Sequence, residues 1–136
     1  MIPAIFEHLE GKETCSTLEE VRAVLERKVD GGNAFYIYRN TDAVYPCLSV
    51  LTRGEYAYIW YAPADESSAG FQAWGEDLGL DPEGFVNFYI PELTVRPNDY
   101  ILSKETALQV VMAFMELEKW PACYEEMPGC VEWEEL

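Results

Sequence analysis

Basic residues are scarce in this chain of 136 residues: 9 Lys and Arg stand against 25 Asp and Glu, for a formal net charge of -16. Between Arg53 and Arg96 there is no Lys or Arg at all. That interval holds the carboxylates Glu55, Asp65, Glu66, Glu76, Asp77, Asp81, Glu83 and Glu92. Nucleic acids and anionic lipids are bound through Lys and Arg contacts to phosphate, so we expect no direct nucleic-acid binding and no membrane binding.

Residue sets for catalysis and for cofactors are also missing. The chain has a single histidine, His8, with no recognisable motif around it. Neither of the glycine-rich phosphate-binding patterns occurs, and the cysteines lack the short spacing of zinc sites. The stretch 77–83 resembles a calcium-binding loop only loosely, since no helices are expected on both sides of it. We therefore predict a protein that is not an enzyme and has no catalytic, metal-binding or cofactor-binding residues.

Long apolar runs are absent too, and none approaches the roughly 20 residues that span a bilayer. The first ten residues contain no Lys or Arg, which argues against a secretory signal. The cysteines Cys15, Cys47, Cys123 and Cys130 form no CxxC pair. We expect reduced thiols in a cytoplasmic protein, because disulfides persist mainly in oxidising compartments.

Hydrophobic residues make up 49% of the chain and aromatic residues 14%, enough for a buried core in one domain spanning 1–136. Thr17 and Glu20 form a capping box before a first amphipathic helix, which we expect to end at the turn 30–33. Ser103 is expected to cap a second, largely apolar helix over about 104–118, ended by Trp120-Pro121.

The middle of the chain is typical of β-structure. Strands are predicted over 34–39, 46–52, 56–61, 70–74 and 85–90, with a last one in the tail 129–136 and a tight turn at 53–55. Within 56–61 the alternation places Tyr56, Tyr58 and Trp60 on one face of the sheet. Short connections favour antiparallel neighbours. The predicted fold class is α+β: a meandering antiparallel sheet of about five or six strands with two helices packed on one face.

Acidic and aromatic residues are interleaved in two segments, one in the middle of the chain and one at its end. Tryptophan and tyrosine are common anchors of protein interfaces, and charge accelerates encounter around them. The alternative is that the acids keep the domain soluble while the aromatics pack in the core. Because solubility needs a net charge of only about 2–8, we favour binding. The candidate partner-binding residues are Asp65, Glu66, Trp74, Glu76, Asp77, Glu125 and Glu126.

The C-terminal third carries a family resemblance. The segment 102–107 opens the apolar helix, Trp120-Pro121 follows it, and the chain closes on Val131-Glu132-Trp133-Glu134. This arrangement resembles the Imm1 family of bacterial immunity proteins, whose tail motif matches Val131, Glu132 and Trp133. The resemblance implies an inhibitor that forms a 1:1 complex with a basic toxin domain, commonly a nuclease or nucleic-acid deaminase, and covers its active-site cleft.

A second hypothesis from a different class stays open. Aromatic residues on the uncovered sheet face could line a pocket of a small ligand-binding domain or enzyme, with Glu55 or Asp42 supplying an acid. The residues concerned are Tyr36, Tyr38, Tyr56, Tyr58 and Trp60. A flat or filled sheet face would argue against this hypothesis, and a deep pocket with converging carboxylates would favour it.

Overall fold

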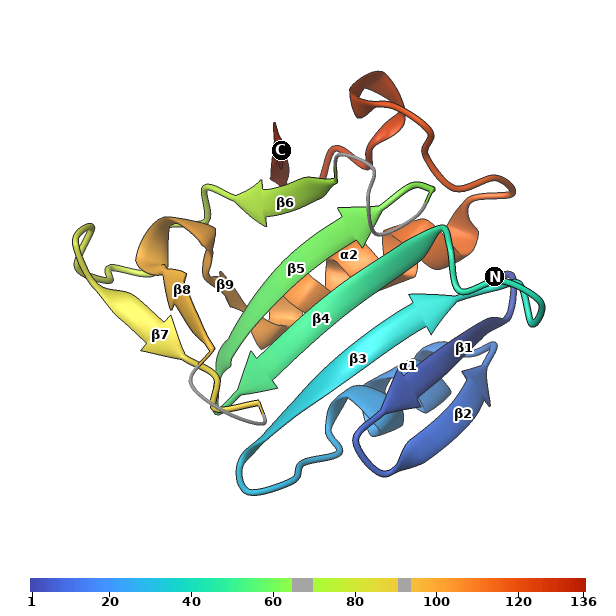
Figure 1. Cartoon of the computed structure of the whole chain (residues 1–136), viewed down its shortest axis with the longest axis horizontal. Coiled ribbons are helices and arrows are strands. Elements are labelled where there is room, and N and C mark those ends of the chain that lie inside the picture. Colours follow the sequence, from blue (N-terminus) through green and yellow to red (C-terminus); the bar gives the residue numbers. More distant parts are fainter. Residues whose placement is uncertain (65–69, 91–93) are drawn as a thin grey trace.

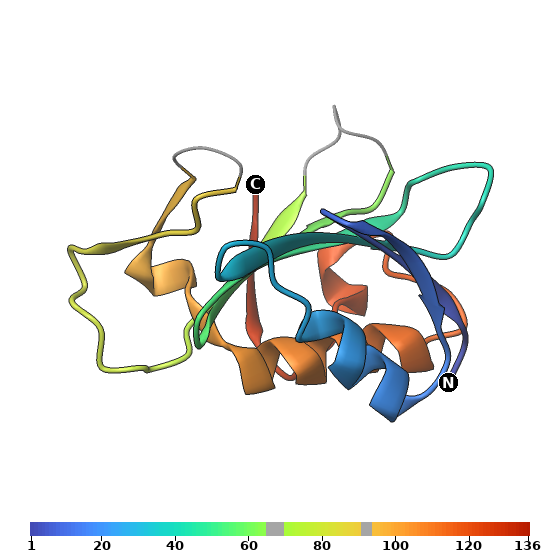
Figure 2. The same ribbon diagram turned by 90° about the horizontal axis from the view of Figure 1, so that it is seen from below.

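The computed structural model describes residues 1–64, 70–90 and 94–136, and they form the predicted α+β architecture. An eight-stranded antiparallel sheet has the order β10-β6-β5-β4-β3-β1-β2, and β9 also pairs with β5. Figures 1 and 2 show both α-helices on one face of this sheet, and among the described residues no α-helix covers the other, which we call the helix-free face. The strands of this sheet are β1 (Ala4–His8), β2 (Gly11–Cys15), β3 (Gly32–Tyr38), β4 (Cys47–Arg53), β5 (Tyr56–Ala62), β6 (Phe71–Trp74), β9 (Leu102–Ser103) and β10 (Glu132–Glu135).

Alternation along the central strands builds the main core. In β5, Ala57, Ile59 and Tyr61 are fully buried beneath the helices, while the residues between them face the other way, as the sequence predicts. The turn between β4 and β5 is Gly54-Glu55, and Gly54 has a φ of 58°, a left-handed conformation that glycine adopts without steric cost. Strand register thereby follows from local sequence in this part of the sheet.

Helix α1 (Leu18–Leu25) begins as predicted. Thr17 is its N-cap and accepts a hydrogen bond from the Glu20 backbone N–H at 3.2 Å. The predicted end at 30–33 is wrong, because the helix stops at Leu25. Val29 and Gly32 already form an antiparallel bridge that leads into β3, and the Asn33 side chain donates to the Arg27 carbonyl at 3.0 Å. These contacts hold the chain after Leu25 in a non-helical path.

Helix α2 (Lys104–Glu116) lies across the sheet with most of its apolar side chains buried, and Ser103 caps it as predicted. Its C-terminal end is bound by Arg39, which follows β3. The guanidinium donates to the carbonyls of Phe114 (3.2 Å) and Met115 (3.0 Å), and more weakly to Glu118 (3.4 Å). It also lies 5.2 Å from the Trp120 ring. A cation at this end complements both the free carbonyls and the helix dipole.

The predicted strand number of five or six is too low. Strands β1 and β2 were not predicted, because their sequence carries Glu7, His8, Lys12 and Glu13 and lacks the apolar alternation of a half-buried strand. The segment 85–90 was predicted as part of the meander. Instead β7 (Phe85–Asn87) pairs with β8 (Val95–Pro97) in a separate two-stranded sheet. Around it lies a second buried cluster centred on Tyr58, Phe88 and Ile101, which covers one end of the helix-free face.

Two further arginines resemble Arg39 in their contacts. Arg53 donates to the backbone carbonyls of Phe88 and Asp30 and lies 5.0 Å from the Tyr89 ring. Arg96 lies 4.8 Å from the Tyr58 ring. In this acidic chain, these three arginines therefore contact carbonyl groups and aromatic rings. None of them forms an ion pair with a carboxylate in the ranges given above.

Replacing Arg39 with Met should destabilise the protein by about 2 kcal/mol, because three carbonyls at the end of α2 lose a charged donor. The free energy of unfolding from urea titration measures this. The control Arg22→Met removes an exposed ion pair and should change stability by about 0.5 kcal/mol or less. Equal effects of the two substitutions would show that Arg39 does not anchor the helix.

Candidate functional site

The helix-free face of the sheet carries one continuous row of side chains that crosses the strands. Strand register places directly opposed residues next to one another from β2 to β10. The members on β1, β3, β4, β5, β6 and β10 point away from the helices, because neighbours on their own strands, such as Phe6, Phe35 and Trp133, enter the main core. Lys12 lies directly opposite Glu7 and so shares its face. Tyr36 and Trp60 occupy the middle of the row, Glu134 stands at one end, and the ion pair of Glu7 with Lys12 (3.5 Å) stands at the other. In order, the row is Lys12, Glu7, Tyr36, Ser49, Trp60, Gln72 and Glu134.

Two hollows meet at the middle of this row, with volumes of about 280 and 220 Å³, and both are lined by Tyr36, Ser49 and Trp60. Tyr36 is 48% exposed, a high fraction for a tyrosine in a central strand. The larger hollow also reaches Arg96, and the smaller one reaches Glu7. The centre of the face thus presents aromatic surface to solvent in shallow, open depressions.

At one end of the row, β10 brings the acidic tail beside the acidic middle segment. Glu132 lies directly opposite Trp74 in the β10–β6 pair, and Trp74 is 41% exposed. A Cβ on Gly75 would lie 3.3 Å from Cγ of Glu132, which shows how closely the two segments approach. A hollow of about 330 Å³ beside Trp74 is lined by the acids Glu76, Asp77 and Asp99 together with apolar side chains such as Leu78. We name Trp74, Asp77, Asp99, Glu132 and Glu134 the acidic edge.

Of the predicted binding residues, the structure brings Trp74 and Asp77 together at this edge. Asp65 and Glu66 lie outside the described residues. Glu125 and Glu126 are exposed in the 3₁₀ turn Tyr124–Glu126, whose Tyr124 ring contacts Phe71 at the opposite end of β6 from Trp74. Glu126 accepts a hydrogen bond from the Ala122 backbone N–H at 3.0 Å, so its carboxylate stabilises the local turn.

Glu76, another predicted binding residue, is half-buried and lines the same hollow beside Trp74, and its carboxylate is already bound by the start of α2. Its carboxylate accepts hydrogen bonds from the Ser103 backbone N–H (3.1 Å), the Ser103 hydroxyl (3.1 Å) and the Thr106 hydroxyl (2.7 Å). Burial raises the pKa of Glu76, but the bonds from Ser103 and Thr106 outweigh burial and hold the pKa below its ordinary value of 4.5. Glu76 therefore acts as a second cap at the N-terminus of α2.

The tail residues that match the family motif divide between core and surface. Trp133 is 6% exposed, donates through Nε1 to the Pro128 carbonyl at 2.8 Å and contacts the Phe114 ring. Val131 packs against the same core, while Glu132 is exposed at the acidic edge. Glu134 and Asp99 were not predicted as binding residues, since their positions depend on long-range contacts: Glu134 on the pairing of β10 with β6, and Asp99 on the hydrogen bond from the Gly75 N–H to the Asp99 carbonyl.

His8 has no free ring nitrogen. Nε2 lies 2.8 Å from the Glu13 carboxylate, and Nδ1 accepts from the Glu10 backbone N–H at 3.2 Å. Arg27 donates to the same Glu13 carboxylate. Hydrogen bonding by Arg27, reinforced by His8, lowers the pKa of Glu13 to about 2. This cluster fixes the β1–β2 hairpin, with both imidazole nitrogens already occupied.

The thiols divide into two groups. Cys15 and Cys47 are buried, and burial raises the pKa of each to about 11, so both stay protonated at neutral pH. Cys123 and Cys130 are exposed, and all four are free thiols. Among the residues described, no three His, Cys, Asp or Glu side chains come together in a group that could hold a metal ion. Likewise, no helix in those residues has the length and apolar character needed to cross a membrane.

The aromatic residues proposed for a ligand pocket are only partly assembled. Tyr36, Tyr58 and Trp60 line the larger hollow, but Tyr38 and Tyr56 do not. Neither hollow of the row is lined by Glu55 or Asp42. The charged group in the larger hollow is the Arg96 guanidinium, so the acid expected for an enzyme is replaced there by a cation.

Two comparisons with known proteins find no match for this chain. No protein-family model matches the chain, and no curated protein is similar to it in sequence. The resemblance of the C-terminal third to immunity proteins stays a prediction from the sequence.

Replacing Glu76 with Gln should lower the free energy of unfolding by about 2 kcal/mol at neutral pH, because α2 loses a charged acceptor. The folded-state pKa is depressed, so this contribution is complete above the unfolded pKa of 4.5 and is lost as pH falls through the folded value. Urea titrations of both proteins from pH 7 to pH 3 should therefore converge toward acid pH.

The control for this experiment is Glu83→Gln, which changes an exposed carboxylate in the same acidic segment. It should alter stability by about 0.5 kcal/mol or less at every pH. A pH-independent difference between wild type and Glu76→Gln would contradict the capping role.

Proposed function

We propose that this protein is an immunity-type inhibitor that binds a basic toxin domain, a nuclease or nucleic-acid deaminase, through the helix-free face of its sheet. The observation that carries the proposal is the cross-strand row. It places exposed aromatic surface at the centre of the face, the acidic Glu134 at one end and the Glu7–Lys12 ion pair at the other. Stable interfaces commonly have this composition, with aromatic anchors in the middle and a polar rim.

The negative charge of the rim favours a partner with a basic surface. The acidic edge adds four carboxylates beside Trp74, and the whole chain has a net charge of -16. A toxin domain that acts on DNA or RNA carries a basic cleft for phosphates, and an acidic surface is attracted to that cleft at long range. Electrostatic steering of this kind raises the association rate most at low ionic strength.

Inhibition would be steric in this proposal. The aromatic residues Tyr36, Trp60 and Trp74 supply the short-range contacts, and the acids occupy cation sites that the nucleic acid would otherwise use. The protein needs no catalytic group for this mechanism. Its interface would form a 1:1 complex and exclude substrate from the toxin cleft.

The test is co-expression with a candidate toxin domain, sought in the genes adjacent to the one that encodes this chain. Cells that express this domain should survive only when the inhibitor is present, and the purified pair should form a 1:1 complex. Tyr36→Ala should weaken binding by about 30-fold, since it truncates an exposed central anchor. The reversals Asp99→Lys and Glu132→Lys together should slow association about tenfold at low salt and much less at high salt.

The charge-matched control is the pair Glu19→Lys and Glu118→Lys, which changes the net charge equally with exposed residues outside this face. This control should retain most of the wild-type association rate. Equal slowing by both pairs would show that only net charge matters and that this face does not bind. If the toxin kills cells with and without the protein, the proposed function is wrong.

A further inference from the structure

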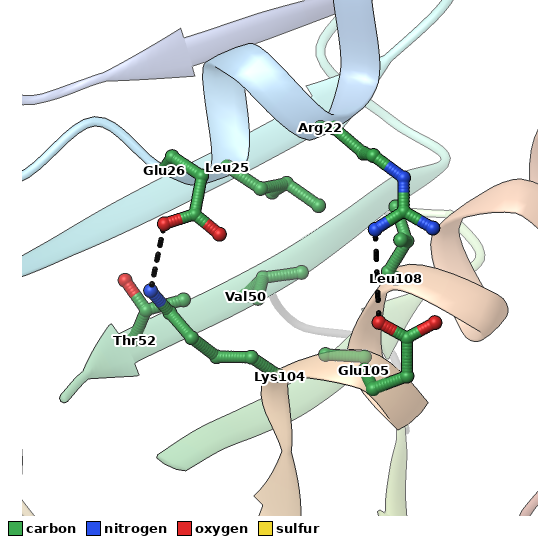
Figure 3. A pocket seen from close by; sticks show the side chains of 9 residues that line it. Arg22, Leu25, Glu26, Val50, Thr52, Lys104, Glu105 and Leu108 are labelled. Carbon is green, nitrogen blue, oxygen red and sulfur yellow. Dashed lines mark ion pairs between the residues drawn. The ribbon is translucent and has the colours of Figure 1, made fainter. Parts of the chain in front are cut away.

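A pocket lies on the opposite side of the sheet, between α1 and α2 over the end of β4 (Figure 3). Its volume is about 160 Å³. Apolar atoms of Leu25, Val50, Ala107 and Leu108 form much of the lining. An apolar cavity of this size holds a benzene ring, so the space suits one small ring.

The rim of the pocket consists of two ion pairs that join the helices. Arg22 of α1 lies 3.7 Å from Glu105 of α2, and Lys104 of α2 lies 3.6 Å from Glu26 of α1. Figure 3 shows these pairs on either side of the pocket, with Leu25 and Val50 between them. The rim holds two cations and two anions, so its net charge is zero on a surface that is otherwise strongly acidic. A ligand with one charge would meet a rim group of the same sign beside each group of opposite sign, and it would lose hydration in the apolar lining.

One polar group faces the pocket without a partner. Thr52 lies on the helix side of β4 and is only 4% exposed. Within the described residues its hydroxyl has no hydrogen bond, and it is not among the fully enclosed unpaired atoms, which are Arg39 Nε and Asn98 Oδ1, so it is reached from the pocket. A nearly buried hydroxyl of this kind gains free energy when a ligand supplies a hydrogen-bonding atom.

From these features we infer that the pocket binds a small, uncharged aromatic molecule with one hydrogen-bonding group, for which phenol is the simplest representative. The ring occupies the space among Leu25, Val50 and Leu108, and the ring hydroxyl meets the hydroxyl of Thr52. The site is separate from the helix-free face and does not depend on the proposed inhibitor function.

The experiment is a titration with phenol, followed by NMR of the full chain carrying labelled Leu and Val methyl groups. Saturable shifts should occur at the methyls of Leu25, Val50 and Leu108, with a dissociation constant on the order of 1 mM. Toluene should bind more weakly, and benzoate should cause no saturable shift. Thr52→Val should lower phenol affinity about tenfold and leave toluene affinity unchanged.

Ala107→Leu fills the pocket and should abolish binding of both neutral ligands. The matched control Ala113→Leu makes the same change on α2 at a position that does not line the pocket, and it should bind phenol as the wild type does. Thermal unfolding of each variant verifies that it is folded. The inference would be overturned by shifts with phenol that do not saturate, or by equal phenol affinity of Ala107→Leu and wild type. It would also be overturned if Thr52→Val lost as much affinity for toluene as for phenol.

Discussion

The structure depends on the way in which both ends of α2 are bound by charged side chains from distant parts of the chain. Glu76 binds the N-terminal end, and Arg39 binds the carbonyls of the C-terminal end. Each charge opposes the partial charge of the helix end that it contacts. Because Arg39 follows the central strand β3 and Glu76 follows β6, the two contacts also fix the helix relative to the sheet. The acidic and aromatic side chains of the helix-free face project from this sheet, whose position relative to α2 is fixed by the two contacts.

The carboxylates of the interval between Arg53 and Arg96 have several different roles. Glu76 caps a helix, while Asp77 and Asp81 accept hydrogen bonds from the backbone two residues ahead and stabilise turns. The acids of this interval therefore differ in role: Glu76 and Asp81 bind backbone groups, while Asp77 both stabilises a turn and belongs to the acidic edge. The surface acids become part of one patch only because β10 adds Glu132 and Glu134 beside Trp74.

Local signals in the sequence predicted much of the fold. The caps Thr17 and Ser103, the turn at Gly54 and the alternation through Trp60 each depend on residues a few positions apart, and the structure confirms all of them. Long-range pairing could not be predicted in this way. Glu76 meets Ser103 across 27 residues, and the pairing of β10 with β6 joins the tail to the middle of the chain. No periodicity or spacing encodes these contacts, so the role of Glu76 and the acidic edge became apparent only in three dimensions.

The contacts of Arg39, Arg53 and Arg96 with carbonyls and rings have a consequence for the response of this protein to ionic strength. Dissolved ions screen attraction between exposed opposite charges, but they act weakly on short contacts to buried dipoles and ring faces. They also reduce the mutual repulsion within a chain of net charge -16. Salt should thus have opposite effects on folding and on the proposed binding: a saline environment favours the folded state, and it would slow encounter with the basic partner that we propose.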